Sequence, residues 1–449
     1  ERGEAGGWAV SRGPGTGLGM AHNEGRCRSG GCVHGRADSG KFAFITRLPG
    51  TGAVLKLLHK LPRTVWLLGL ISLFNDAASD MIYPLVPLFL ASVLMAGPRA
   101  LGLIEGVVEA TSSVVKLAAG VLADRMRHMR GWVIGGYLLA GVARPLIGLA
   151  QSWLGVFGAR VADRLGKGIR TAPRDALLSA SVAPGQRGLA FGLHRAMDNT
   201  GAVIGPLVAA AMLAAGISLR EIFLWSIVPA LVVVGLSLVL REPDVVQAAA
   251  PARVDWQFRN LPQPLRRYLL VLALFTLGNS SNMFLLLRAQ DLGVGAERVV
   301  LMWALFSAVA AVFSTPLSAL SDRHGRIRVL GIAWGAYAAA YLVLGLLPAA
   351  GWALWVSFAG YGLVMAALEG TEKALVADLV DAGRGGTAYG WYNLVAGIML
   401  LPASILFGWL WQDGSPLLAF AFGAACSGLA AVLLVTWVRR ARPLAHATS

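Results

Sequence analysis

Five basic side chains follow one another at helical spacing within one apolar stretch of the chain. They are Arg160, Arg164, Lys167, Arg170 and Arg174. At 100° per residue of an α-helix they fall within an arc of about 120°, so one face of this helix is ionic. Arg holds an anionic group through two hydrogen bonds, and Lys holds it as a point charge. We therefore expect Arg160, Arg164 and Lys167 to bind an anionic group.

Carboxylates in two other apolar stretches have the chemistry of proton carriers. Asp76 and Asp80 lie four residues apart near the start of the apolar region, and Glu372 lies in a later stretch. A carboxylate shielded from water can bind and release a proton near neutral pH. Asp76 and Asp80 are equally suited to an ion pair with a neighbouring Arg. Glu372 is a second candidate carrier because Glu369 and Lys373, four residues apart, are able to neutralise each other.

Three further polar residues are expected at the same site. Arg195 adds a cation on the helix that follows the basic row, and Asp198 lies four residues after His194 on that helix. This spacing allows a hydrogen bond between the imidazole and the carboxylate, either as a structural pair or as a proton shuttle. Asn279 belongs to the second half of the chain. We expect Arg195, Asp198 and Asn279 to contribute to binding.

The composition places all these residues in a membrane. The chain has 449 residues, of which 56% are hydrophobic and only 14% are charged, and its mean hydropathy is +0.63. A soluble domain carries about 25% charged residues, so a large soluble enzyme, a repeat solenoid and a disordered scaffold are excluded. Each charge inside a bilayer must face protein or water, because burying it in lipid costs about 2.5–3.5 kcal/mol.

Apolar stretches long enough to span a bilayer, about 20 residues each, predict twelve transmembrane helices. They run at residues 64–93, 101–122, 131–150, 153–180, 187–214, 220–240, 267–292, 298–320, 327–347, 351–378, 386–412 and 416–438. An even number of spans puts both termini on one side. Arg residues gather in alternate connections and at the tail, so the positive-inside rule predicts cytoplasmic termini.

An internal repeat divides the helices six and six. A shift of 198 residues aligns Asp124-Arg125 with Asp322-Arg323, Ala176 with Ala374 and Gly192 with Gly390. Many secondary transporters are built from two parallel halves with a central binding site between them. We expect a disordered cytoplasmic segment at 1–62, with Met20 a possible start, and bundles at 63–241 and 267–440. A cytoplasmic linker at 242–266 and a tail at 441–449 complete the expected organisation.

Four sequence elements resemble those of the major facilitator superfamily. Gly120-Val-Leu-Ala-Asp124-Arg125 and Ser318-Ala-Leu-Ser-Asp322-Arg323-His-Gly325-Arg326 resemble its loop signature G-x-x-x-D-R-x-G-R-R. Arg164-Leu-Gly-Lys167-Gly168 resembles R-x-x-Q-G, with Lys in place of Gln. Gly201-Ala-Val-Ile-Gly205-Pro206 resembles the antiporter element G-x-x-x-G-P, although alanines replace the two glycines that should follow. The resemblance covers the whole membrane region and implies an all-α fold of two pseudo-symmetric six-helix bundles.

The loop signature implies a conformational latch. Asp124, beside Arg125, would contact the start of the eleventh helix near Arg384, and Asp322, beside Arg323, would contact the fifth helix near Arg187. These contacts would break when the halves rock, unless the charges only anchor the topology. Gly201, Gly205 and Pro206 permit close helix packing and a bend.

Several function classes are excluded by the sequence. The formal charge of +15 comes from Lys and Arg between apolar segments, which argues against nucleic-acid binding. Three cysteines cannot form a disulfide framework. The sequence shows no phosphate-binding loop, no zinc-ligand spacing and no catalytic nucleophile with a base. We expect neither enzyme activity nor a cofactor or metal.

The resemblance implies a monomeric multi-pass transporter of the inner cell membrane, driven by protons and exporting a small organic solute. The basic face predicts that this solute is anionic. Proton-driven uptake of an organic anion and a non-transporting sensor of the same fold remain as alternatives.

Overall fold

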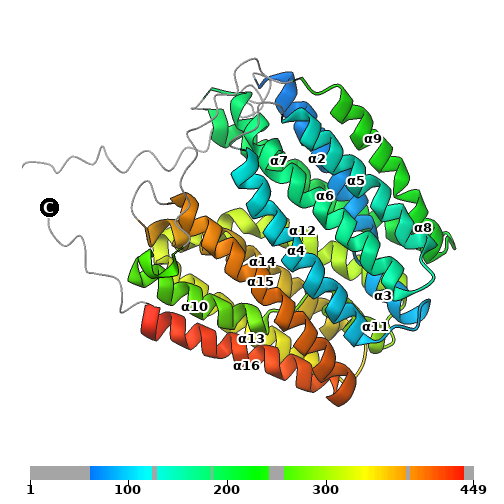
Figure 1. Cartoon of the computed structure of the whole chain (residues 1–449). Coiled ribbons are helices and arrows are strands. Elements are labelled where there is room, and N and C mark those ends of the chain that lie inside the picture. The colour runs from blue at the N-terminus through cyan, green and yellow to red at the C-terminus, as the bar shows by residue number, and fades with distance from the viewer. Residues whose placement is uncertain (1–60, 124–128, 184–185, 242–256, 381–384, 439–449) are drawn as a thin grey trace, which may run out of the picture. The chain divides into compact units, whose positions relative to one another are not determined.

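The computed structural model describes residues 61–123, 129–183, 186–241, 257–380 and 385–438. Within these ranges all regular secondary structure is helical (Figure 1). The expected segment 1–62, linker 242–266 and tail 441–449 fall largely or wholly outside the described residues. All described residues belong to one compact unit, residues 57–449.

The described residues of the first half form eight helical segments. They are α2 (Arg63–Ile82), α3 (Leu85–Ser92), α4 (Pro98–Ala123), α5 (Arg130–Leu149), α6 (Trp153–Ala180), α7 (Arg187–Ala214), α8 (Leu219–Trp225) and α9 (Ile227–Leu238). The first expected span is two helices, α2 and α3, because Pro84 has no backbone N–H to continue the hydrogen-bond ladder. The sixth expected span is likewise α8 followed by α9.

The second half repeats this order. After the short η3 (Phe258–Asn260) come α10 (Gln263–Gly278), α11 (Met283–Asp291), α12 (Ala296–His324), α13 (Arg326–Leu346), α14 (Trp352–Asp378), α15 (Gly385–Trp409), η4 (Leu410–Gly414), α16 (Pro416–Leu433) and η5 (Leu434–Val438). Proline begins α16, and Ser415 accepts a hydrogen bond from the backbone N–H of Leu418 at its start. The expected all-α arrangement of twelve spans in two six-helix bundles is confirmed.

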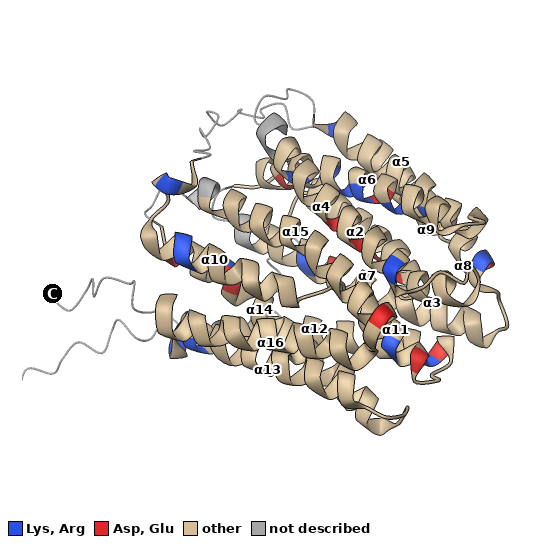
Figure 2. Cartoon of the chain, turned by 60° about the horizontal axis from the view of Figure 1, so that its bottom comes forward, with Lys and Arg blue, Asp and Glu red and all other residues tan. Residues whose placement is uncertain are grey.

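Ten helical spans in the described residues are long and apolar enough to cross a bilayer, and three of them each join two consecutive α-helices, α2 with α3, α8 with α9 and α10 with α11. The helices α4 and α6 are not among these ten, and they carry buried charges such as Glu105 and Arg160. In Figure 2 charged residues lie along helices inside the bundles as well as at the helix ends. These two helices are therefore built to face other helices.

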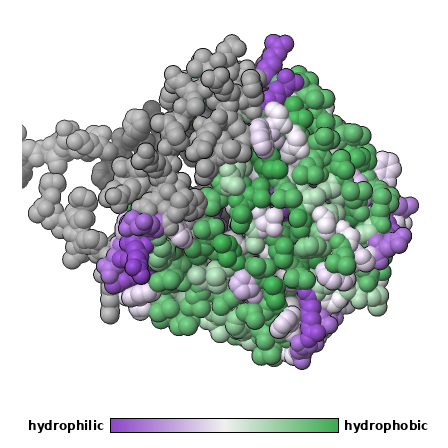
Figure 3. Space-filling view, in the orientation of Figure 1, coloured by the Kyte–Doolittle hydropathy of each residue, from purple (hydrophilic) through white to green (hydrophobic). Residues whose placement is uncertain are grey.

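The outward faces of the bundles are apolar. Large exposed side chains line α5, for example Leu138, Val142 and Leu146, and α9 and α13 show the same pattern. The space-filling view shows this broad hydrophobic surface, with hydrophilic residues mainly at its margins (Figure 3). A surface of this kind is stable only against lipid, so the chain is a multi-pass membrane protein.

At the end where α4 begins, the backbones of the two halves approach each other closely. A side chain on Gly408 of α15 would approach the backbone oxygen of Pro98 to 2.6 Å, and one on Gly102 of α4 would approach that of Ser404 to 2.3 Å. Farther along, Gly390 of α15 faces only Leu117, at 3.9 Å. The halves are thus closed at the end where α4 begins, which we call the closed end.

Candidate functional site

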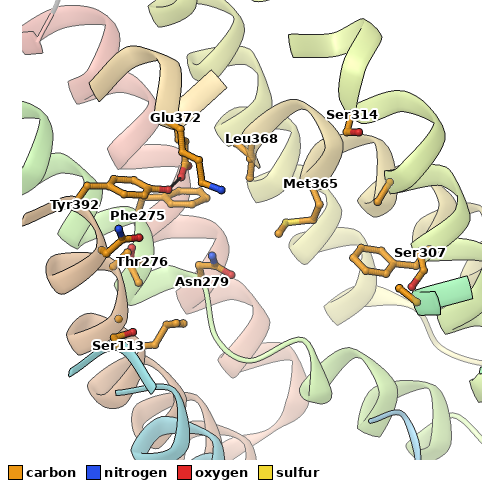
Figure 4. Close-up of a pocket in the computed structure, with 18 of the residues that line it drawn as sticks. Ser113, Phe275, Thr276, Asn279, Ser307, Ser314, Met365, Leu368, Glu372 and Tyr392 are labelled. Carbon is orange, nitrogen blue, oxygen red and sulfur yellow. Dashed lines mark hydrogen bonds between the residues drawn. The ribbon is translucent and has the colours of Figure 1, made fainter. Parts of the chain in front are cut away.

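A cavity of about 500 Å³ lies between the two halves. Its walls come from α2, α4 and α7 of the first half and from α10, α12, α14 and α15 of the second. Phe275, Trp303, Phe306 and Tyr392 supply aromatic surface (Figure 4). Thr276, Asn279, Ser307 and Ser314 are among its polar residues. A largely apolar cavity with a few polar groups is the usual form of a small-molecule site.

One carboxylate of each half faces this cavity, Asp80 on α2 and Glu372 on α14. Glu372 is buried and accepts a hydrogen bond of 2.7 Å from the Tyr392 hydroxyl, drawn as a dashed line in Figure 4. Its other oxygen accepts a bond of 3.2 Å from the Trp334 indole N–H. Both donors are neutral, so protonation of Glu372 leaves neither of them as an unpaired charge.

Asp80 lies in a mixed electrostatic environment. Its neighbours include the carboxylate of Asp76 and the cations Lys167 and Arg164. Asp76 itself accepts a hydrogen bond of 2.8 Å from the side-chain amide of Asn75. Of the sequence-predicted residues, the structure thus brings Asp80, Glu372 and Asn279 to the cavity wall, with Asp76 next to Asp80.

Two cations of the basic row, Arg160 and Arg164, form buried ion pairs with α4. Arg160 donates to Glu105 at 2.7 Å, and both side chains are almost fully buried. Arg164 lies 3.1 Å from Glu109. Neither arginine is among the residues that line the cavity. In this state both side chains neutralise acids of their own half.

The sequence contains a signal for these pairs. Glu105 and Glu109 are four residues apart on α4, and Arg160 and Arg164 are four apart on α6. Since α4 and α6 run in the same direction, two matched i, i+4 pairs meet in register. Arg144 of α5, which the spacing of charges did not single out, donates from Nε to Asp163 at 2.9 Å.

The remaining cations of the row differ in exposure. The Lys167 side chain is solvent-accessible, with Asp76 and Glu109 among its electrostatic neighbours. Arg170 is buried with its guanidinium 4.4 Å from the Tyr137 ring centroid, which is a cation–π contact. Arg174 bonds to its neighbour Asp175 at 2.8 Å. Lys167 is therefore the accessible cation of this row.

On α7 the structure joins two of the expected polar residues. Asp198 accepts a hydrogen bond from Ser72 of α2 and lies 3.5 Å from His194 Nδ1. Arg195 is exposed on the same helix. Asp198 has Asp76 among its electrostatic neighbours, so a line of carboxylates runs from α7 to Asp80.

The expected latch is described only in part. Asp124, Arg125 and Arg384 lie outside the described residues, and the side chain of Arg187 is not described. Asp322 lies 3.3 Å from Arg326, one turn later in the chain, and Arg326 lies 3.0 Å from Asp378 of α14. Arg323 is exposed. Asp322 in this state is paired within its own half.

The glycines of α7 let it pack closely against α2. A side chain on Gly201 would approach the backbone oxygen of Leu73 to 2.3 Å, and one on Gly205 would approach that of Ala77 to 2.4 Å. Pro206 lies inside the helix just after them. This packing fixes the position of α2, and therefore of Asp76 and Asp80, relative to α7.

Comparisons with known proteins agree with this architecture. The model of the Major Facilitator Superfamily matches residues 68–287 and 268–449. An uncharacterised MFS-type transporter, MJ1317 of Methanocaldococcus jannaschii, is 35% identical over 392 residues, which cover 84% of this chain and 95% of that protein.

Two further matches are more distant. The multidrug resistance protein MdtH of Aeromonas hydrophila is 29% identical over 143 residues, 32% of this chain and 36% of that protein. The crystal structure of the nucleoside transporter NupG superposes with a TM-score of 0.68 at 13% identity, over 83% of this chain and 98% of that one. The NupG match concerns the fold alone.

Proposed function

This chain belongs to the Major Facilitator Superfamily, and from that premise we propose that it exports a small organic anion in exchange for protons. Family membership itself makes it a membrane-embedded transporter of small molecules and not an enzyme. The finer proposal depends mainly on one observation. The cavity between the halves is faced by one carboxylate from each half, Asp80 and Glu372.

Proton coupling requires a carboxyl group that changes its protonation as the cavity changes access. Glu372 meets this need because its two donors, Tyr392 and Trp334, are neutral and stay in place when it is protonated. Asp80 also meets this need, because the charges around a carboxyl group decide whether it is protonated. The charge of an entering solute would add to those of Asp76 and Lys167. The two carboxyls would then exchange protons with the side to which the cavity is open.

The anionic nature of the solute is proposed from the cations near the cavity. Lys167 is accessible beside Asp76 and Asp80, and Lys373 lies on the cavity wall. Lys holds a carboxylate or phosphate as a point charge. Arg160, Arg164 and Arg195 would add to the positive potential of this half, with Asp198 and Asn279 orienting the solute.

Export is proposed from sequence similarity. The Gly201-to-Pro206 element resembles that of antiporters, and part of the chain is similar to the multidrug resistance protein MdtH. With cytoplasmic termini, the closed end would face outward and the cavity would open to the cytoplasm. Rocking of residues 63–241 against 267–440 in one monomer would reverse this, and the Asp124 and Asp322 latches would close the inner side.

Purified protein in liposomes tests the proposal. A pH-sensitive dye is trapped inside, a pH gradient is imposed, and a panel of organic anions, cations and neutral drugs is added in turn. We expect proton flux that depends on an anion, with the anion moving against the protons. Glu297→Gln is the matched control, because Glu297 is an exposed acid at the start of α12, away from the cavity.

The outcomes separate the alternatives. Loss of flux in Asp80→Asn or Glu372→Gln but not in Glu297→Gln supports the proposal. Movement of the anion with the protons would replace export by uptake. If folded protein moves no compound, the result favours the non-transporting sensor. If proton flux depends only on added cations, the proposal of an anionic substrate is wrong.

A further inference from the structure

The seventh expected span is interrupted in its middle. Helix α10 ends at Gly278 and α11 begins at Met283, which leaves Asn279, Ser280, Ser281 and Asn282 between them, the 279–282 break. Lipid offers no hydrogen bonds, so interrupted backbone inside a membrane requires protein or water around it. Here the N–H groups of Phe284 and Leu285 donate back to the carbonyl oxygens of Ser281 and Asn282 at 3.0 and 3.1 Å.

Three buried tyrosines of the same half hold the break in place. Tyr337 donates to Asn279 Oδ1 at 2.9 Å, and Tyr361 donates to Asn282 Oδ1 at 2.7 Å. The Tyr341 hydroxyl lies 3.3 Å from Ser280 Oγ. These rings come from α13 and α14 and are almost completely buried. The position of the break is therefore determined by its own half.

The remaining side chain of the break, Ser281, reaches across to the other half. Its hydroxyl donates to Glu105 Oε2 at 3.1 Å, while Glu105 Oε1 accepts from Arg160 at 2.7 Å. All three side chains are buried. The break is thus bound to the carboxylate that anchors the α4–α6 ion pair.

The first half contains the counterpart of this contact. Under the 198-residue shift of the internal repeat, Tyr83 corresponds to Ser281, and Glu105 corresponds to Trp303. Tyr83 follows the end of α2, in the interruption between α2 and α3, and its ring stacks on Trp303 at 4.9 Å between centroids. The two halves are therefore joined by two repeat-related contacts, one hydrogen bond and one aromatic stack.

Both contacts adjoin the cavity. Asn279 and Trp303 line it, while Ser281 and Tyr83 bind the opposite half. Asn279 and Ser281 are two residues apart, which is at most about 7 Å of chain. A solute that bonds to the Asn279 amide would compete with Tyr337 for it. Any resulting shift of the break would act directly on the Ser281–Glu105 bond.

We propose that the two helix interruptions couple occupancy of the cavity to closure of the far end, with Ser281–Glu105 and Tyr83–Trp303 among the contacts that break when that end opens. Ser281 and Tyr337 act as positioning residues. The inference rests on the proposed alternating access and adds the elements that would transmit it. Packed contacts with two discrete arrangements are the usual basis of such switching.

Distances between spin labels test this without any substrate or proton gradient. Labels are placed on cysteines at Gln151 and Ala350, exposed residues of the α5–α6 and α13–α14 connections at the closed end, after Cys27, Cys32 and Cys426 are replaced. Double electron–electron resonance then reports the separation of the halves. We expect one dominant short distance in the otherwise unchanged protein.

Two variants should move population to a longer distance. Ser281→Ala removes the cross-half bond directly, and Ser281→Thr, which keeps the hydroxyl, should restore the short distance. Tyr337→Phe removes the hydroxyl that holds Asn279 at the cavity wall. A longer spin-label distance in this variant would show that a change at the cavity reaches the closed end. Matched controls are Ser112→Ala and Tyr268→Phe, whose buried hydroxyls have no hydrogen-bond partner among the described residues.

The outcomes decide the matter. Shifts in Ser281→Ala and Tyr337→Phe, with none in the two controls, support the proposal. An unchanged distance in either variant of well-folded protein overturns it, as does an equal shift in Tyr268→Phe. Because the measurement needs no transported compound, failure here leaves proton coupling untouched, and failure of proton coupling leaves this result intact.

Discussion

At the scale of single residues, the environment of Glu372 determines what it can do. It is a buried acid whose hydrogen bonds come from Tyr392 and Trp334. In Glu372→Gln the amide oxygen can accept from Trp334 and the amide NH₂ can donate to the Tyr392 hydroxyl oxygen, so we expect the protein to fold with an unchanged melting temperature. We also expect loss of proton-coupled flux while exchange of solute for solute persists. Counterflow of a radiolabelled substrate beside dye-reported proton flux measures both.

Retention of proton flux in this variant would contradict the assignment and leave Asp80 as the remaining cavity carboxylate. Glu297→Gln again serves as the control, because its carboxylate is exposed in the first turn of α12. It should change neither the melting temperature nor the flux.

The Glu105–Arg160 pair should respond quite differently to substitution. Both partners are almost fully buried at 2.7 Å. Removing one partner of a buried pair leaves an uncompensated charge and typically costs about 3–5 kcal/mol. We expect Glu105→Leu to lower the melting temperature in detergent strongly. Replacing both residues, Glu105→Leu with Arg160→Met, should recover much of the loss, because the orphaned charge is gone.

If the double variant is no more stable than Glu105→Leu alone, the uncompensated charge of Arg160 is not the cause of the loss. Arg99→Met provides the control, since Arg99 pairs with Asp413 at an exposed site, where water and salt screen the ion pair. Its effect on the melting temperature should be small.

At the scale of helices, the close packing of α7 against α2 requires glycine at the points of contact. A Cβ on Gly205 would lie 2.4 Å from the Ala77 backbone oxygen, and backbone atoms cannot move aside cheaply. Gly205→Ala should therefore separate α7 from α2 and lower the melting temperature by several degrees. Gly192→Ala on the same helix, where nothing lies within 4 Å, should be neutral or slightly stabilising. Equal melting temperatures for the two variants would refute this.

The helices themselves were predictable from the sequence to within a few residues, because hydropathy sets their number and length. The interruptions at 83–84 and 279–282 were not predicted, although Pro84 and the polar run at 279–282 are signals for them. Their positions depend on partners far away in the chain, such as Tyr337 and Tyr361 for the second interruption. The second interruption is a run of four polar residues, Asn279 to Asn282, which fits either a turn or the polar face of a continuous helix.

The candidate site was predictable only in its residue types. The sequence identified Asp80, Glu372 and Asn279, which now share one cavity. It did not predict that Arg160 and Arg164 would be paired, because pairing depends on which helix faces α6. Nor did it predict that the Tyr392 hydroxyl of α15 donates to Glu372 of α14 at the cavity wall. Partners from separate helices become visible only when the helices are packed.

At the scale of the whole transporter, closure depends on how nearly α4 and α15 can approach each other. A Cβ on Gly102 would lie 2.3 Å from the Ser404 backbone oxygen, whereas one on Gly390, near the other end of α15, would meet only Leu117 at 3.9 Å. Gly102→Ala is therefore a wedge at the closed end. We expect it to shift the protein toward the state in which the cavity opens at that end, while Gly390→Ala leaves the balance unchanged.

Labelling of a cavity cysteine from each side of the membrane measures this shift. Ser307→Cys, on the cavity wall, is introduced in the background without other cysteines and treated with a membrane-impermeant thiol reagent. Inside-out vesicles should label well with or without the wedge, because the cavity is proposed to open to the cytoplasm. Right-side-out vesicles should label slowly until Gly102→Ala is added and faster afterwards. An unchanged outside rate in folded Gly102→Ala protein would mean that α4 and α15 are not the closing surface, because a wedge between two rigid backbones cannot be accommodated without separating them.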